Sequence, residues 1–213
     1  MVSDGHWVDW HTAYDDPESA LSRRLAVVRR RLSAALDAVA PGPVRLVSMC
    51  AGEGRDVIPV VAAHPRGRDV VARLVELDPV LVARARSVAA DLPGVEVVHR
   101  DASDTTAYDG AVPADVVLVC GVFGNVSDDD VRTTVRELPA LCAPGATVLW
   151  TRHPRDPDLN PSIRAWFADE GFAEVAFDVA PDGAYAVGTA RYEGAPRPFR
   201  TGRRLFTFTG DGS

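Results

Sequence analysis

A glycine-rich turn between an apolar run and a helical pattern constrains this chain more than any other feature. The run from Val44 to Met49 is mostly apolar, the small residues Ala51-Gly52-Glu53-Gly54 follow, and an apolar helical pattern begins at Val57. This order predicts a buried strand, a tight turn and a helix start. Because glycine lacks a Cβ atom and tolerates positive φ, a ligand can approach the backbone of such a turn closely.

A second apolar run ends in an acid at a suitable distance from this turn. The run covers residues 70–76 and ends at Glu76, 22 residues after Gly54. In dinucleotide-binding βαβ units, an acid at the end of the second strand accepts hydrogen bonds from ribose hydroxyls. The spacing therefore predicts that Glu76 binds the ribose of a nucleotide-like cofactor.

Composition indicates one globular domain and narrows the partners. The 213 residues suffice for a single full core, and 46% hydrophobic with 25% charged residues is ordinary for a globular protein. A formal net charge of −7 argues against nucleic acid as the main partner. The N-terminus has no signal-peptide pattern, and no apolar run approaches the ~20 residues of a membrane span. Three cysteines without metal-like spacing indicate reduced thiols, so we expect a cytoplasmic protein with no membrane partner.

Strand and helix patterns alternate along most of the chain, which predicts a parallel sheet covered on both faces. A first helix is expected from the Asp16-Pro17 start signal to about Ala40. The expected strands are about 44–49, 70–76, 95–100, 114–120 and 146–152, and the expected helices are about 55–63, 79–91, 128–142 and 161–170. Asp78, Ser127 and Asn160 supply the start signals of the last three helices. Three further strands, 172–179, 184–192 and 203–209, follow without helices between them, so at least one pair must be antiparallel.

Four motifs in this order resemble those of the class I S-adenosylmethionine-dependent methyltransferases. Ser48-Met-Cys-Ala-Gly52-Glu-Gly54 resembles the loop around the methionine part of the cofactor, and Glu76 stands where the ribose-binding acid is found. Asp101-Ala102 resembles the adenine-binding pair, and the stretch from Val117 to Asp128 resembles the motif at which the methyl group meets its acceptor. The family usually has an acid at the position of Ser48 and a glycine at that of Cys50.

The resemblance implies a fold, a cofactor and a set of contacts. The fold would be a three-layer α/β/α sandwich around a mostly parallel seven-stranded sheet with an antiparallel C-terminal strand. Residues 1–43 would form an N-terminal lid segment and helix, and residues 44–213 the cofactor-binding core. The cofactor would be S-adenosylmethionine, and the residues expected to bind it are Cys50, Ala51, Gly52, Gly54, Glu76, Leu77, Asp101, Ala102, Cys120 and Gly121.

The acceptor site is less defined, and each candidate has a structural alternative. His153, expected at the carboxyl end of a strand, and His11 are rival candidates for a general base. Asn125 could bind the acceptor or serve the turn before the next helix, and Phe123 is expected to line the same site. Trp7, Trp10 and Tyr14 could form a lid over the acceptor or pack the first helix onto the sheet. The acids at positions 128–130 suit a first helical turn, so no metal site is expected.

The leading hypothesis is a metal-independent methyltransferase that acts on an oxygen or nitrogen atom of a small metabolite. Methyl transfer requires little beyond alignment and desolvation of the reacting atoms, so few catalytic residues are needed. One alternative is a nicotinamide-dependent oxidoreductase, although its fingerprint requires glycine at three positions and only Gly52 and Gly54 are present. A non-catalytic S-adenosylmethionine-binding module is the other alternative.

Overall fold

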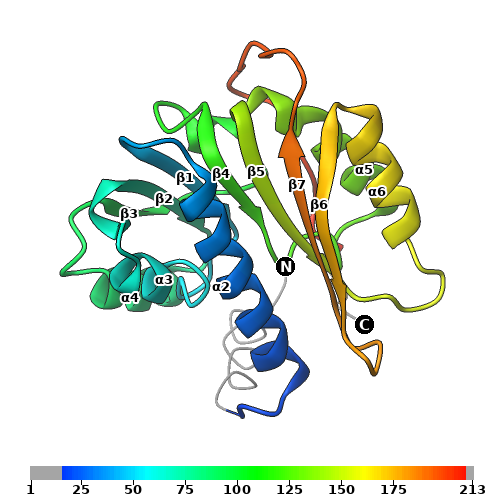
Figure 1. The fold of residues 1–213 in the computed structure, drawn as a ribbon, viewed down its shortest axis with the longest axis horizontal. Helices are drawn as coiled ribbons and strands as arrows, with labels where there is room; N and C mark the ends of the chain where they lie inside the picture. The colour runs from blue at the N-terminus through cyan, green and yellow to red at the C-terminus, as the bar shows by residue number, and fades with distance from the viewer. Residues whose placement is uncertain (1–15, 210–213) are drawn as a thin grey trace.

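The computed structural model of the protein describes residues 16–209, which form a sheet covered by helices on both faces (Figure 1). Its seven strands lie in the order β3-β2-β1-β4-β5-β7-β6. The strands are β1 (Val44–Met49), β2 (Val70–Glu76), β3 (Val95–His99), β4 (Ala114–Val119), β5 (Cys142–Arg152), β6 (Phe172–Val179) and β7 (Ala186–Tyr192). The α-helices are α2 (Ala20–Ala38), α3 (Ile58–Ala63), α4 (Pro79–Val88), α5 (Asp128–Glu137) and α6 (Asn160–Asp169). No helix within residues 16–209 is long and apolar enough to cross a membrane.

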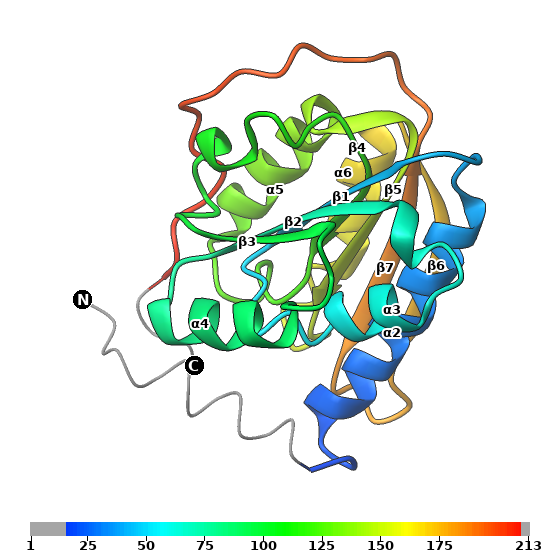
Figure 2. The same ribbon diagram turned by 90° about the vertical axis from the view of Figure 1, so that its left-hand side faces the viewer.

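Each face of the sheet has its own apolar core, because successive side chains of a strand point to opposite faces. In β1, Val44 and Leu46 belong to the core beneath α2, α3 and α4, whereas Val47 and Met49 belong to the core beneath α5 and α6. Figure 2 shows these two groups of helices on opposite sides of the sheet. The predicted three-layer α/β/α sandwich is therefore confirmed.

The parallel strands bring the predicted motifs to one edge of the sheet. Strand β1 pairs in parallel with β2 and β4, and β4 pairs in parallel with β5. The residues that follow these four strands, Cys50, Leu77, Cys120 and His153, consequently lie along the carboxyl edge. Open α/β sheets bind their ligands at this edge.

The sheet ends in an antiparallel pair, as the missing helices after residue 171 predict. Strand β7 lies between β5 and β6 and runs antiparallel to both. Dinucleotide-binding sheets with the order 3-2-1-4-5-6 have no such inserted strand. This topology favours the methyltransferase hypothesis over the oxidoreductase one.

Helix α2 begins later than the sequence predicts. Its N-cap is Ser19, whose Oγ accepts a hydrogen bond from Ser22 N at 3.1 Å. The expected N-cap at Asp16 is wrong, because that carboxylate accepts from Glu18 N at 2.9 Å in a preceding turn. Asp16-Pro17 therefore starts a turn, and the helix starts at Ala20.

Two of the other three start signals are confirmed. Asp78 accepts from the N–H groups of Val80 and Leu81, and Ser127 accepts from Asp130 N. The third is displaced by one residue: α6 begins at Asn160 itself, with Pro161 in its first turn, and the Asp158 carboxylate accepts from Asn160 N at 2.9 Å.

The predicted strand over residues 203–209 is wrong. These residues make only isolated bridges, Arg204 with Asp104 and Phe208 with Val126. They end a segment, residues 193–209, that we call the C-terminal strap. Figure 2 shows the strap passing over the far end of the sheet after β7 and returning past α5 toward the carboxyl edge.

The strap fills a space that the connection between β3 and β4 leaves open. That connection contains only the short 3-10 helix η3 (Thr105–Tyr108). Leu205 and Phe206 of the strap are each 1% exposed and join the core that also contains Tyr108. The strap is therefore part of the packed structure.

Close packing of Trp150 against β7 gives a prediction for stability. A Cβ atom on Gly188 would lie 2.1 Å from Cε2 of Trp150, so one of the two strands would have to shift. We expect Gly188→Ala to lower the free energy of unfolding by about 1–3 kcal/mol, the usual cost of overpacking. Denaturant titration would measure this loss. Adding Trp150→Leu, which removes the ring that the methyl group meets, should cost less than the sum of the two single changes; full additivity would contradict the clash.

Candidate active site

The glycine turn after β1 adopts the left-handed backbone conformations that its sequence predicts. Gly52 and Gly54 have φ values of 56° and 70°. Cys50 has φ 51° and is the only non-glycine residue with positive φ among residues 16–209. The turn is held to β2 because Ala51 N donates to Val75 O at 2.9 Å. Cys50 thus takes a left-handed backbone conformation that favours glycine, at a cost of about 1–2 kcal/mol.

The carboxylate of Glu76 joins the glycine turn to the loop after β2. Its Oε2 accepts a hydrogen bond from Gly52 N at 2.7 Å, and its Oε1 accepts from Leu77 N at 2.8 Å and Asp78 N at 2.9 Å. The side chain is 9% exposed. A carboxylate has about four acceptor sites, so Glu76 can hold this turn and still accept from a ribose hydroxyl.

Two buried oxygen atoms beside the turn have no hydrogen-bond partner within residues 16–209. They are Oγ of Ser48, at the end of β1, and Oδ1 of Asp56, just before α3. Buried polar atoms are nearly always satisfied, and such exceptions often mark a ligand site. Together with the glycine backbone, they fit the amino-acid end of S-adenosylmethionine.

The loops after β2 and β3 offer an apolar surface beside an acid. Leu77 is 57% exposed next to Glu76, and Ala102 is buried. Asp101 is half-exposed, and its Oδ1 accepts from both N and Oγ of Ser103, at 2.9 Å and 2.7 Å. An exposed leucine next to a carboxylate suits the face and the amino group of an adenine ring.

The C-terminal strap contacts this acid. Arg204 lies 3.5 Å from Oδ2 of Asp101 and donates to Oγ of Ser103 at 2.8 Å. Leu205 N also donates to Ser103 O at 2.7 Å. The strap therefore fixes the loop that carries the predicted adenine-binding pair.

This contact predicts that Arg204 supports cofactor binding. The pair with Asp101 is largely exposed, so it should contribute at most ~1 kcal/mol. Arg204→Ala should weaken binding of S-adenosylhomocysteine about three- to fivefold in calorimetry. Arg203→Ala is the matched control, because Arg203 pairs with Glu137 at 3.4 Å and does not touch Asp101. Equal effects of the two changes would rule out a specific role for Arg204.

The loop after β4 is shaped by its own polar contacts. Gly121, with φ 77°, donates through N to Thr151 Oγ1 at 2.9 Å. Asn125 donates through Nδ2 to Gly121 O at 2.7 Å, and its own carbonyl accepts from Thr209 of the strap. The Asn125 amide thus serves the turn, which was the structural alternative for this residue. The Phe123 ring is fully buried against Trp150, at 6.1 Å between ring centroids, so it supports the loop from beneath.

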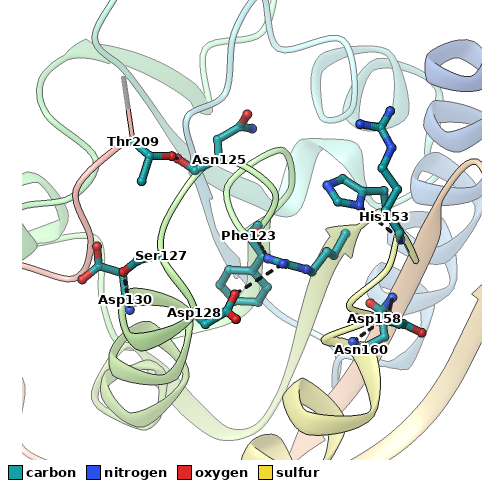
Figure 3. Close-up of polar contacts among 11 residues, drawn as sticks. Phe123, Asn125, Ser127, Asp128, Asp130, His153, Asp158, Asn160 and Thr209 are labelled. Atoms are coloured by element: carbon teal, nitrogen blue, oxygen red, sulfur yellow. Dashed lines mark hydrogen bonds and ion pairs between the residues drawn. The ribbon is translucent and has the colours of Figure 1, made fainter. Parts of the chain in front are cut away.

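His153 lies across from this loop at the end of β5 (Figure 3). Its Cδ2 is 3.5 Å from the position that a Cβ on Gly124 would take. Burial and the nearby charges of Arg155 and Arg152 lower the pKa of His153 from its usual 6.5, so the imidazole is neutral at pH 7. Arg155 N donates to Nδ1 over 3.3 Å, a long hydrogen bond. A neutral imidazole beside the post-β4 loop is suited to accept a proton.

The cysteines at the carboxyl edge are not nucleophiles. Burial raises the pKa of Cys50 and of Cys120 well above the ordinary thiol value, with smaller contributions from Glu76 for the first and Asp56 for the second. Both remain protonated at neutral pH, and thiols react as thiolates.

Some of the predicted site lies outside residues 16–209, namely Trp7, Trp10, His11 and Tyr14. Conversely, no sequence pattern singles out Asp56, Arg204 or Thr151. Within residues 16–209, no group of three or more His, Cys, Asp or Glu side chains could hold a metal ion. The acids at positions 128 and 130 have other partners: Asp128 pairs with Arg152 at 3.4 Å, and Asp130 accepts from Thr207 N at 3.0 Å.

Comparison with known proteins agrees with this site. A family model described as "Putative methyltransferase" matches residues 21–175. No curated protein matches the chain.

Several solved structures share the fold at low sequence identity. Magnesium protoporphyrin IX methyltransferase from Synechocystis PCC 6803, with bound S-adenosylmethionine, is 13% identical with a TM-score of 0.68, covering 89% of this chain and 92% of that one. N-methyltransferase NodS from Bradyrhizobium japonicum WM9, in complex with S-adenosylhomocysteine, is 16% identical with a TM-score of 0.62, covering 90% and 99%. The 1,6-didemethyltoxoflavin-N1-methyltransferase of Burkholderia thailandensis is 19% identical with a TM-score of 0.61, covering 88% and 87%.

The family match spans well over half of the chain. The four motifs follow β1, β2, β3 and β4 at one edge of a sheet with the order β3-β2-β1-β4-β5-β7-β6. The chain therefore belongs to this methyltransferase family and has the fold of the class I S-adenosylmethionine-dependent methyltransferases.

Proposed function

We propose that the protein transfers the methyl group of S-adenosylmethionine to an oxygen or nitrogen atom of a small metabolite, without a metal. The observation that carries this proposal is the junction at Glu76, where one buried carboxylate holds both the glycine turn and the loop after β2. Bound there, the cofactor supplies an electrophilic methyl group. The solved N-methyltransferases of similar fold support nitrogen as one acceptor atom.

The chain's own residues would bind the cofactor, orient the acceptor and remove a proton from it. Glu76 would hold the ribose, Leu77 and Asp101 the adenine, and the glycine turn the amino-acid end. His153 would accept the proton that an acceptor hydroxyl or ammonium loses as it is methylated. For Nε2 to act as this base, the proton of the neutral ring must reside on Nδ1. A protonated Nδ1 cannot accept the long hydrogen bond from Arg155 N, so that bond would be lost.

Four further residues of the predicted acceptor site lie outside residues 16–209. We retain Trp7, Trp10 and Tyr14 as candidate acceptor contacts and His11 as the rival base, on the sequence argument alone. The division into a lid segment with its helix (1–43) and a core (44–213) is likewise a proposal. A cytoplasmic location is inferred from the three free cysteines.

A screen of metabolite extracts with isotopically labelled S-adenosylmethionine would test the proposal. We expect at least one small molecule to gain the mass of one labelled methyl group in the presence of the protein. A gain seen only on macromolecules would contradict the substrate class. Binding of S-adenosylhomocysteine without any transfer would instead support a non-catalytic binding module.

A further inference from the structure

A pocket beneath the C-terminal strap gathers arginine side chains that the proposed function does not use. The pocket has a volume of about 280 Å³ and lies between the strap and the end of α5. Its walls include four arginines and one acid, namely Arg136, Arg197, Arg200, Arg203 and Glu137. The whole chain has a formal net charge of −7, so positive charge concentrated in one hollow calls for an explanation.

The carboxylates at this pocket are too few to neutralise the arginines. Oε1 of Glu137 is shared, since it lies 3.4 Å from Arg203 and 3.9 Å from Arg136. Arg197 pairs with Glu170 at 2.8 Å. Four positive charges thus face two carboxylates among residues 16–209, which leaves the pocket with a net charge of +2.

Arg200 carries charge that no neighbour balances. The residue is exposed, and its guanidinium makes no ion pair or hydrogen bond with residues 16–209. Its backbone is nevertheless fixed, because Arg200 O accepts a hydrogen bond from Thr105 Oγ1 at 2.8 Å. The side chain is therefore held at the pocket by its backbone and is open to an anion from solvent.

The wall that carries three of the arginines is fixed without any ligand. Arg203 N donates to Thr105 Oγ1 at 2.9 Å, and Thr105 N donates to Arg203 O at 2.9 Å. Gly202 N donates to Thr106 Oγ1 at 3.0 Å. Because these bonds hold the strap on η3, a ligand would enter a pocket that already exists, as is usual for small-molecule sites.

The pocket is separate from the proposed active site. Leu141, one of its lining residues, directly precedes β5, whereas His153 directly follows β5. The two ends of a strand lie at opposite edges of its sheet. An anion in the pocket would consequently lie away from the carboxyl edge at which the cofactor is expected.

We propose that this pocket binds the phosphate group of a small phosphorylated molecule. A guanidinium presents its N–H donors in a planar fork that matches phosphate oxygens. A phosphomonoester carries a charge of about −1.5 to −2 at pH 7, which balances the pocket. Phe199, half-buried in the wall, offers an apolar face to the organic group of such a ligand. This inference stands apart from the proposed function, because it requires neither the cofactor nor methyl transfer.

Titration with phenyl phosphate, followed by backbone amide NMR at constant ionic strength, tests the proposal. We expect saturable shifts at residues 105, 136–141 and 197–203, with a Kd of roughly 10 mM or below. Benzenesulfonate has the same ring and a single negative charge, so it should bind about threefold or more weakly. Arg200→Ala should weaken phenyl phosphate binding about three- to tenfold and leave the affinity for S-adenosylhomocysteine within about twofold of the wild type.

Arg204→Ala is the matched control, because Arg204 belongs to the same strap, contacts Asp101 and does not line the pocket. It should leave phenyl phosphate binding unchanged and weaken S-adenosylhomocysteine binding, the reverse of Arg200→Ala. Equal weakening of phenyl phosphate binding by the two changes would show diffuse attraction only and overturn the site. Absence of saturable shifts, or shifts confined to residues 120–125 and His153, would overturn it as well.

Discussion

Glu76→Ala is expected to weaken binding of S-adenosylhomocysteine about a hundredfold. A hydrogen bond from a ribose hydroxyl to the remaining acceptor site of this carboxylate is worth about 1.5–3 kcal/mol, and alanine cannot form it. The change also leaves the buried N–H of Gly52 without its partner at 2.7 Å, which should lower the free energy of unfolding by about 1–3 kcal/mol. Calorimetry and denaturant titration would measure the two effects separately.

The neighbouring Asp78 provides the control for this prediction. It caps α4 through Val80 N and Leu81 N and does not contact the glycine turn. Asp78→Ala should cost about 1 kcal/mol of stability and little affinity. If Glu76→Ala folds and binds S-adenosylhomocysteine as tightly as the wild type, Glu76 does not hold the ribose.

His153→Ala is expected to lower the turnover rate about a hundredfold or more, the usual contribution of a general base. Binding of S-adenosylhomocysteine should be unchanged, because His153 lies at the end of β5, away from Glu76 and Asp101. The readout is kcat with the acceptor that the extract screen identifies. His153→Gln, which keeps a polar side chain without a titrating base, should be similarly slow.

The pH dependence of the wild type tests the same role. The pKa of His153 is lowered from 6.5, so the base form persists at neutral pH and is lost only below pH 6.5. We therefore expect kcat to be flat near pH 7 and to fall at more acidic pH, with this fall absent in His153→Ala. An unchanged rate in His153→Ala would exclude it as the base and direct attention to His11.

Local sequence patterns were sufficient to predict most of the core. Strands β1 and β2 begin and end at the predicted residues. β1 is an apolar run between a Pro-Gly-Pro stop and a glycine turn, and β2 is an apolar run between Asp69 and the Asp78-Pro79 start of the next helix, so their boundaries have little freedom. Asp78 and Ser127 act as caps because capping depends on neighbours within four residues. The start of α2 was predicted wrongly because Asp16 and Ser19 both have capping side chains, and their competition is decided by the turn at Pro17.

The strap could not be predicted because its conformation depends on a space elsewhere in the fold. Residues 203–209 are rich in the aromatic and threonine residues that strands favour, yet they form only isolated bridges and join no strand of the sheet. Leu205 and Phe206 are buried where the connection from β3 to β4 has no α-helix to cover that face. Long-range packing of this kind overrides the local pattern.

The candidate site likewise contains residues that the sequence predicts and residues that it does not. Glu76, the glycine turn and the position of His153 follow from strand ends, which the sequence marks. Asp56 and Arg204 were missed because their environment depends on the fold: Oδ1 of Asp56 has no hydrogen-bond partner within residues 16–209, and Arg204 contacts Asp101. The burial of Phe123 was missed for the same reason, since its ring packs on Trp150 from another strand.

Hydrogen exchange of the backbone amides, measured with and without S-adenosylhomocysteine, tests the central claim most directly. The claim is that the cofactor binds at the carboxyl edge, across the loops after β1, β2, β3 and β4. We predict ligand-dependent protection in residues 48–57, 76–78, 100–103 and 120–125, and little change in β6 or α6. Protection elsewhere with none in these four segments, or protection by NAD and not by S-adenosylhomocysteine, would contradict the account.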